Sequence, residues 1–180
     1  MSFPHSADLL ARAAAIRLVG FDIDGTLTDG RLVYDSDGRE LKAFHSQDGM
    51  GISLLRRHGI AVAFVTARRS PVVELRGAEL GIEHVCTHEK DKLGRMRALA
   101  AGQGLDLSQV AFMGDDLPDL EVLKAVGLSA APADAHGWTA AQVHYVTPRA
   151  GGQGAARDLC DLLLEAQGHA AALRETGAHG

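Results

Sequence analysis

The sequence predicts an α/β fold with a doubly wound parallel sheet, and three observations support this prediction. Short apolar runs without polar alternation recur along the chain, which is typical of strands covered on both faces. Segments with apolar residues at helical spacing separate these runs, as in right-handed βαβ units. The chain holds 21 glycines but only 4% aromatic residues, which favours a parallel sheet with tight loops over an aromatic-cored sandwich.

The first half of the chain opens with an apolar run at Leu18–Phe21, which ends at acidic residues and predicts a buried strand. A β-hairpin is expected over Arg31–His45, because two extended segments flank the turn sequence of Asp35–Gly38. A helix over Gly51–His58 follows. The clearest strand comes next at Ile60–Val65, where every residue is apolar.

The second half alternates helix and strand more regularly. Ser70-Pro71 places a capping residue before a first-turn proline, which predicts a helix that runs to Leu80. Further helices are expected around Leu93–Ala100, Leu117–Ala125 and Gly154–Gln167, and further strands at His84–Cys86, Val110–Met113, Val126–Ala130 and Val143–Val146. The tail, about residues 170–180, is expected to be flexible. Since no long insertion interrupts the pattern, no separate cap domain is expected.

Length, charge and cysteine content limit the function classes. The 180 residues predict a single domain over residues 1–180. The formal charge of −5 argues against a general nucleic-acid binder, which needs a basic surface. The apolar runs are far shorter than the ~20 residues that span a bilayer, and the N-terminus lacks a signal-peptide core, so no membrane partner is expected. Two cysteines cannot form a disulfide framework, and we expect a reducing, cytoplasmic location.

The residues that follow the expected strands carry the chemistry, because open α/β sheets bind ligands beyond the carboxyl ends of their strands. Asp22–Thr26 (DIDGT) follows the first strand, and Thr66–Arg68 (TAR) follows Ile60–Val65. Gly114–Asp119 (GDDLPD) follows a later strand, and Lys92 opens the helix between them. One edge of the sheet is therefore expected to collect carboxylates, a hydroxyl and an ammonium group.

These groups suit a phosphoryl-transfer site. Asp22, Asp24 and Asp115 offer only oxygen ligands, with no cysteine or histidine beside them, so Mg²⁺ is the expected metal. Thr66 and Lys92 can hold phosphate oxygens, and a carboxylate can serve as the nucleophile. Each motif alone also fits an ordinary turn, strand end or helix cap. Their combination in this order at strand ends favours the catalytic interpretation.

The motifs resemble those of the haloacid-dehalogenase superfamily of phosphotransferases over about residues 15–167. The resemblance extends to the capless branch that contains 3-deoxy-D-manno-octulosonate 8-phosphate phosphatases. The segments that carry this closer resemblance are Asp24–Gly30, Lys42–Phe44, Asp48–Ile52, Gly114–Leu120, Ala133–His136, Tyr145–Thr147 and the late glycine motif Gly151–Ala155. It implies a Rossmann-like α/β fold with a hairpin insertion and no cap domain.

The resemblance also implies a role for each motif residue. Asp22 would be the nucleophile, and Asp24 would protonate the leaving sugar oxygen and then activate the hydrolytic water. Mg²⁺ would be held by the Asp22 carboxylate, the Asp24 backbone carbonyl and the Asp115 carboxylate. Thr66 and Lys92 would hold the transferring phosphoryl oxygens.

The implied substrate is a phosphorylated sugar acid, 3-deoxy-D-manno-octulosonate 8-phosphate, hydrolysed in lipopolysaccharide precursor synthesis. Ala67, Arg68 and Gln153 are the expected substrate contacts, whereas Asp116 and Asp119 would support the metal ligands from behind. Gln153 stands where many members have arginine, and glutamine cannot pair charge with the substrate carboxylate. Arg68 is therefore the first candidate for that contact.

The family further implies a homotetramer, in which the Arg31–His45 hairpin covers a neighbouring active site. A neighbour's hairpin would exclude water from a site that has no lid of its own. A plain edge decoration is the alternative interpretation of this hairpin.

Two other functions compete with this interpretation. A nonulosonate (sialic-acid-type) 9-phosphate phosphatase would have a similar site, but such enzymes often carry an acid where this chain has Arg68. A receiver-like signalling domain also surrounds Mg²⁺ with aspartates, a threonine and a lysine. In a receiver the acidic pair comes early and the phosphorylated aspartate mid-chain, whereas here Asp22 and Asp24 come first and the acidic pair last. Motif order therefore disfavours the receiver.

Overall fold

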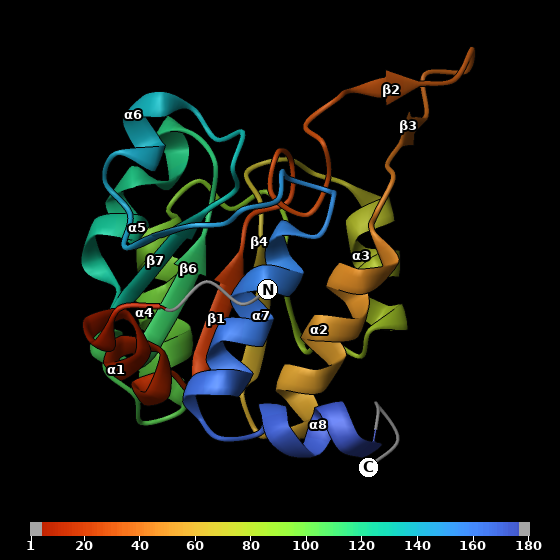
Figure 1. Cartoon of the computed structure of the whole chain (residues 1–180). Coiled ribbons are helices and arrows are strands. Elements are labelled where there is room, and N and C mark those ends of the chain that lie inside the picture. The colour runs from red at the N-terminus through yellow and green to blue at the C-terminus, as the bar shows by residue number, and fades with distance from the viewer. Residues whose placement is uncertain (1–4, 177–180) are drawn as a thin grey trace.

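The computed structural model describes residues 5–176, which form a parallel sheet between two layers of helices (Figure 1). The six-stranded sheet has the order β5-β4-β1-β6-β7-β8. Its strands are β1 (Leu18–Phe21), β4 (Ala61–Val65), β5 (His84–Cys86), β6 (Val110–Met113), β7 (Leu128–Ala131) and β8 (Tyr145–Val146). Every neighbouring pair in this sheet is parallel. The predicted doubly wound sheet is thus confirmed.

The strands at the centre of the sheet are apolar because both of their faces are covered. All residues of β1 and β6 are buried. Gly20 of β1 pairs with Ala63 of β4 on one side and Phe112 of β6 on the other. A Cβ at Gly20 would overlap the side chains of Phe112 and Met96, so glycine lets the helix layer approach this strand closely.

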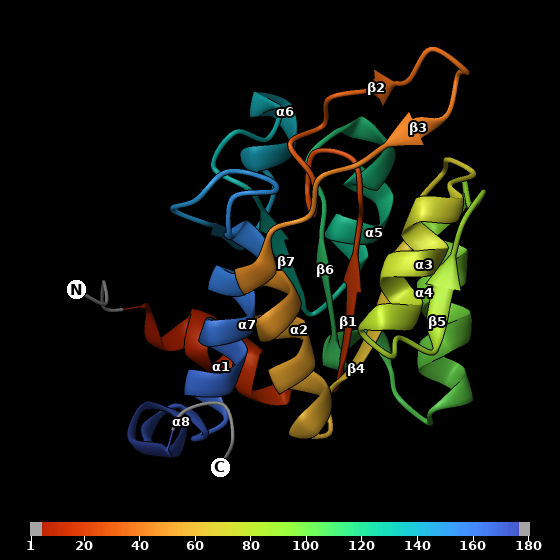
Figure 2. The same cartoon turned by 90° about the vertical axis from the view of Figure 1, so that its right-hand side faces the viewer.

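Helices cover both faces of the sheet, with α1, α2 and α7 on one face and α4 and α5 on the other (Figure 2). The longer helices are α1 (Ala7–Ala15), α2 (Ser46–Arg57), α3 (Pro71–Glu79), α4 (Lys92–Gly102) and α7 (Ala155–Ala166). The shorter ones are α5 (Leu120–Ala125), α6 (Gly137–Ala140), α8 (Ala170–Thr176) and the 3-10 turns η1 (Leu107–Gln109) and η2 (Leu117–Asp119). Within the described ranges, no helix is long and apolar enough to cross a membrane.

Several helical segments differ from the sequence prediction: α6 and η1 were not expected, and the helix expected over Leu117–Ala125 begins as the 3-10 turn η2. Helix α1 was not expected, yet the Ser6 side chain caps its start and Leu9 and Ala13 are buried. Helix α2 begins earlier than predicted, because the His45 ring accepts a hydrogen bond from the Gln47 amide and caps the first turn. Helix α8 occupies most of the segment expected to be a flexible tail, and residues 177–180 lie outside the described residues.

The predicted hairpin is present as the antiparallel strands β2 (Val33–Tyr34) and β3 (Glu40–Leu41), which project from the body beyond the carboxyl ends of the sheet (Figures 1 and 2). The Asp35 side chain accepts hydrogen bonds from the Asp37 and Arg39 amides and so organises the turn. The chain returns from β3 directly into α2, and no cap domain is inserted.

Candidate active site

The site lies where the strand order reverses. From β1 the chain moves outward to β4 and β5, then crosses back to β6 on the other side of β1. Loops that leave β1 and β6 therefore diverge and open a crevice at their carboxyl ends. The crevice is a cavity of about 180 Å³. Its lining residues are Asp22, Asp24, Thr66, Ala67, Arg68, Lys92, Asp115, Asp116, Pro118 and Asp119.

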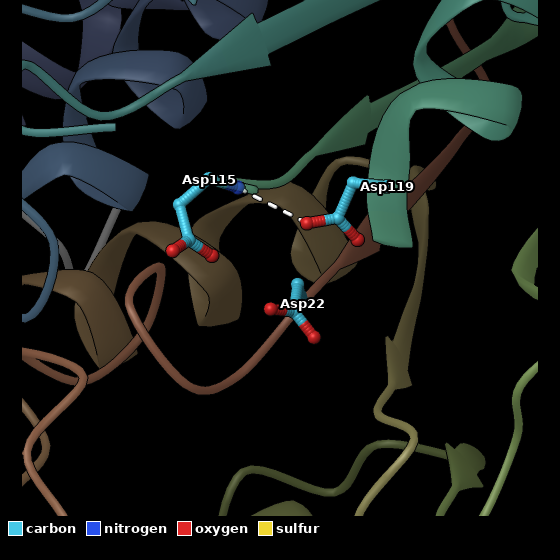
Figure 3. Close-up of side chains that lie close together, drawn as sticks. All are labelled: Asp22, Asp115 and Asp119. Atoms are coloured by element: carbon cyan, nitrogen blue, oxygen red, sulfur yellow. Dashed lines mark hydrogen bonds between the residues drawn. The ribbon is translucent and has the colours of Figure 1, made fainter. Parts of the chain in front are cut away.

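Three carboxylates gather at the floor of this cavity, from Asp22, Asp115 and Asp119 (Figure 3). One oxygen from each lies within 4.8 Å of the others. Lys92 Nζ bridges two of them, at 2.6 Å from Asp22 Oδ1 and 2.6 Å from Asp119 Oδ1. Asp119 Oδ2 accepts hydrogen bonds from the Asp115 and Asp116 amides, at 3.1 and 3.4 Å. Because both its oxygens are engaged, Asp119 anchors the cluster and leaves Asp22 and Asp115 facing each other.

The charges of the cluster fit a divalent cation. Burial and repulsion from Asp119 raise the pKa of the Asp22 carboxyl to about 8, although Lys92 lowers it. Burial and Asp119 also raise the pKa of Asp115 to about 6. Burial is the larger cause of both pKa shifts, and the added repulsion from Asp119 indicates that Lys92 does not remove all of the negative charge gathered here. An all-oxygen donor set with uncompensated charge is the environment that a hard cation such as Mg²⁺ prefers.

The loop after β1 is a tight turn that permits this close approach. The amides of Thr26, Leu27 and Thr28 all donate to the Ile23 carbonyl. Gly25 has a φ of +91°, and a Cβ there would overlap the Asp115 carboxylate. Thr26 Oγ1 also lies 3.3 Å from Asp115 Oδ1, to which it donates. The glycine of the DIDGT sequence therefore serves both the turn and the contact between the loops.

The loop after β4 is held by the loop after β5. The Glu89 amide donates to the Thr66 carbonyl at 2.9 Å, and the His88 amide donates to the Arg68 carbonyl at 3.1 Å. The Thr66 side chain is buried, and its Oγ1 accepts from the Arg68 amide at 3.2 Å. These bonds fix the Thr66 hydroxyl and the small Ala67 at the cavity wall.

The Asp24 side chain turns toward the hairpin. Its Oδ1 accepts a hydrogen bond from Lys42 Nζ, and Lys42 in turn pairs with Glu40. Arg68 donates to Tyr34 Oη at 3.1 Å and to Glu40 Oε1 at 3.0 Å. Lys42 and Glu40 were not proposed as site residues from the sequence. The KAF segment that contains Lys42 carried the family resemblance, but nothing local indicated this contact.

Comparison with known proteins identifies the family. Residues 79–159 match the haloacid dehalogenase-like hydrolases. The chain is 46% identical over 165 residues to the 3-deoxy-D-manno-octulosonate 8-phosphate phosphatase of Escherichia coli K12, covering 92% of this chain and 88% of the relative. The chain belongs to this phosphatase family. The capless α/β fold and the resemblance seen in the motifs are thereby confirmed.

Solved structures of the family agree closely with this chain. The Moraxella catarrhalis 3-deoxy-D-manno-octulosonate 8-phosphate phosphatase, in complex with magnesium, phosphate and KDO, is 39% identical with a TM-score of 0.93, covering 96% of this chain and 99% of its own. The cobalt-bound Haemophilus influenzae phosphatase is 36% identical with a TM-score of 0.88, covering 93% and 98%. Both relatives bind a divalent metal.

In this phosphatase, the late glycine loop packs one residue against the site and leaves another outside the cavity. Gly151 packs against the loop after β1, where a Cβ would overlap the Gly25 carbonyl oxygen. Gln153 is exposed and does not line the cavity. Asp116 is exposed at the cavity rim and caps η2 by accepting from the Leu117 amide at 2.8 Å. All predicted site residues except Gln153 line the cavity.

Proposed function

We propose that this chain is a Mg²⁺-dependent phosphatase that hydrolyses 3-deoxy-D-manno-octulosonate 8-phosphate to the free sugar acid and phosphate, for lipopolysaccharide precursor synthesis. The observation that carries the proposal is the convergence of Asp22, Asp115, Thr66 and Lys92 in one cavity at the carboxyl edge of the sheet. The 46% identity to a phosphatase of that specificity and the Moraxella complex support the substrate.

The metal site we propose consists of the Asp22 and Asp115 carboxylates and the Asp24 backbone carbonyl. Asp119 supports it from behind, since its carboxylate is engaged by Lys92 and by the Asp115 amide. Asp116 supports it through the turn that it caps. When bound, Mg²⁺ supplies charge neutralisation and orientation for the phosphate dianion.

The chemistry we propose divides between two aspartates. An Asp22 oxygen forms a bond to phosphorus while the bond from phosphorus to the sugar oxygen breaks, and Asp24 gives that leaving oxygen a proton. Asp24 then takes a proton from water, whose oxygen attacks phosphorus and releases Asp22. Thr66 and Lys92 hold the phosphoryl oxygens during both steps. Attraction to Asp22 and Asp119 outweighs the effect of burial on Lys92, so its pKa is raised and it remains charged.

Arg68 is our candidate for the substrate carboxylate. Its Nη2 is already engaged by Tyr34 and Glu40, but its buried Nε has no hydrogen-bond partner among the described residues. Arg68 Nε lies 3.8 Å from Asp24 Oδ2 but donates no hydrogen bond to it, so this guanidinium at the cavity wall can still donate one to an anionic oxygen of the substrate. Ala67 lines the cavity beside it, whereas Gln153, which is exposed outside the cavity, would contribute little.

We also infer that residues 1–180 act as one cytoplasmic domain that assembles into a homotetramer. The hairpin exposes a set of large apolar side chains: Leu32, Val33, Tyr34 and Leu41. Apolar side chains on a projecting hairpin are expected to be covered in a stable assembly. We propose that a neighbouring chain covers them, and that the hairpin helps to enclose the neighbour's cavity.

A phosphate-release assay over a panel of phosphorylated sugar acids tests the proposed function. With Mg²⁺ present, the octulosonate 8-phosphate should give the highest kcat/KM, and excess chelator should abolish the activity. Full activity in chelator would contradict the metal dependence. If a nonulosonate 9-phosphate outcompetes the octulosonate in a mixture, the substrate assignment is wrong and the sialic-acid-type alternative replaces it.

A further inference from the structure

The return strand of the hairpin buries a lysine against the site. The Lys42 side chain is only 1% exposed, and its Nζ donates to Asp24 Oδ1. Nζ also lies 3.2 Å from Glu40 Oε1. A buried ammonium group is costly unless it is paired, so this position requires carboxylate partners. Lys42 has them on both sides.

Glu40 fixes the position of Lys42 from outside the cavity. Its Oε2 accepts from Ser70 Oγ at 2.7 Å, next to the start of α3. Its Oε1 accepts from Arg68 Nη2 at 3.0 Å, on the loop after β4. Glu40 therefore connects the hairpin to two elements of the main domain. Lys42 is held in place by more than its own side-chain packing.

The two oxygens of Asp24 consequently have different environments. Oδ1 is bound by Lys42, whereas no described residue donates a hydrogen bond to Oδ2, since Arg68 Nε lies 3.8 Å away. Asp24 lines the cavity, so Oδ2 is the oxygen left for proton exchange with substrate and water. A carboxylate held at one oxygen keeps the other at a fixed position, and proton transfer depends on that position.

We propose that Lys42, held by Glu40, is a positioning residue that orients the Asp24 carboxylate for proton transfer to the leaving oxygen. This inference rests on the phosphatase function proposed above. Lys42 contacts Asp24 rather than Asp22 or the other lining residues in the interactions described, so its effect is exerted through Asp24. Its loss should therefore impair protonation of a poor leaving group and leave phosphate binding nearly unchanged.

Leaving-group dependence separates positioning from a general structural role. A sugar alkoxide leaves only with a proton, whereas p-nitrophenolate leaves readily without one. The ratio kcat/KM reports steps up to cleavage of the substrate ester, so later hydrolysis of the aspartyl-phosphate does not enter the comparison. Three substrates are sufficient: the sugar-acid phosphate, a neutral sugar phosphate and p-nitrophenyl phosphate.

Lys42→Met removes the ammonium group and keeps much of the apolar stem. We expect kcat/KM to fall about 10–100-fold for both sugar phosphates and less than about threefold for p-nitrophenyl phosphate. Glu40→Gln should show the same pattern with a smaller loss, because Lys42 remains but is held less firmly. Lys124→Met is the matched control, since Lys124 is exposed on α5 and does not line the cavity, so this variant should keep wild-type ratios.

Equal losses on all three substrates, or no loss on any, would overturn the proposal. If Lys42→Met does not fold, as judged by thermal melting, Glu40→Gln and Lys42→Arg decide the question through the same ratios. Failure of the proposed substrate is a separate outcome. In that case the wild-type enzyme would cleave other sugar phosphates better than the octulosonate ester, and the comparison of sugar ester with aryl ester would still test Lys42.

Discussion

Two aspartates separated by one residue have different surroundings, because each contacts a different lysine. Asp22 pairs with Lys92, which belongs to a helix of the main domain and also binds Asp119. Asp24 pairs with Lys42, which belongs to the hairpin. One carboxylate thus faces the other acids of the cluster, and its neighbour faces away from them. Different surroundings are what a nucleophile and an acid–base group require of identical side chains.

The nucleophile assignment predicts the outcome of a single substitution. Asp22→Asn should abolish phosphate release with every substrate, because an amide does not attack phosphorus at a useful rate. Asp106→Asn, at an exposed turn far along the chain, should retain activity and serve as control. Mass spectrometry of the trapped wild-type intermediate should locate the phosphoryl group on Asp22. A phosphoryl group on any other residue would refute the assignment.

A different prediction concerns Arg68, which we propose binds the substrate carboxylate. Arg68→Ala removes one charge-assisted contact, which should lower kcat/KM for the sugar-acid phosphate roughly 10–150-fold. A neutral sugar phosphate and p-nitrophenyl phosphate have no carboxylate and should lose much less. Gln153→Ala, which alters an exposed side chain, should have a small effect on all substrates. Equal losses across the panel would show that Arg68 acts on the phosphate or only supports its loop.

Residues at strand ends were predictable, whereas the Lys42 contact was not. The carboxyl ends of parallel strands must share one edge, so Asp22, Thr66 and Asp115 could be brought together from the order of apolar runs alone. Lys42 and Asp24 are 18 residues apart and meet only because the hairpin folds back over the site. The orientation of a hairpin relative to a sheet depends on tertiary contacts, and no local pattern specifies it.

At the scale of elements, the glycine turn after β1 determines how closely this loop can approach the Asp115 carboxylate. Gly25→Ala combines an unfavourable φ with overlap against the Asp115 carboxylate. We expect about 1–3 kcal/mol of lost stability together with weaker Mg²⁺ binding by titration calorimetry. Gly38→Ala is a matched control, because Gly38 has a φ of +76° but a Cβ added there would meet nothing within 4 Å. It should lose stability only, and equal metal affinity in both variants would contradict the steric argument.

Helices and strands were predicted correctly where apolar residues recur strongly in the sequence. The prediction failed where a helix is held mainly by its packing against the core. The buried runs of β1, β4 and β6 carry an unambiguous signal, and their boundaries shift little in the structure. Helix α1 is rich in alanine, so few large apolar residues mark its buried face, and the helix depends on contacts of Leu9 and Ala13 with the core. Helix α8 likewise places Leu173 against the core cluster from a segment with weak periodicity.

At the scale of the whole molecule, assembly and activity are predicted to change together. Light scattering should give the mass of four chains, and dilution below the dissociation range should lower specific activity. A Val33→Ser, Leu41→Ser variant should shift the mass toward the single chain, because both side chains are half exposed on the hairpin. Leu75→Ser, on the exposed face of α3 and 64% exposed, is the control. A fully active single chain would rule out the proposed assembly.

The contact between the hairpin and Asp24 has a consequence for inhibition. A compound that mimics the phosphate must be strongly anionic to satisfy Lys92 and the metal, and such compounds cross membranes poorly. A neutral compound wedged between Tyr34 and Glu40 would instead displace the hydrogen bonds that hold Arg68 and Lys42. Because Arg68 is the proposed contact for the substrate carboxylate, inhibition of this kind would lower kcat/KM for the sugar-acid phosphate without competing with inorganic phosphate, which steady-state kinetics can distinguish. The hairpin is therefore a target for uncharged inhibitors, although the cavity of this enzyme is suited to anions.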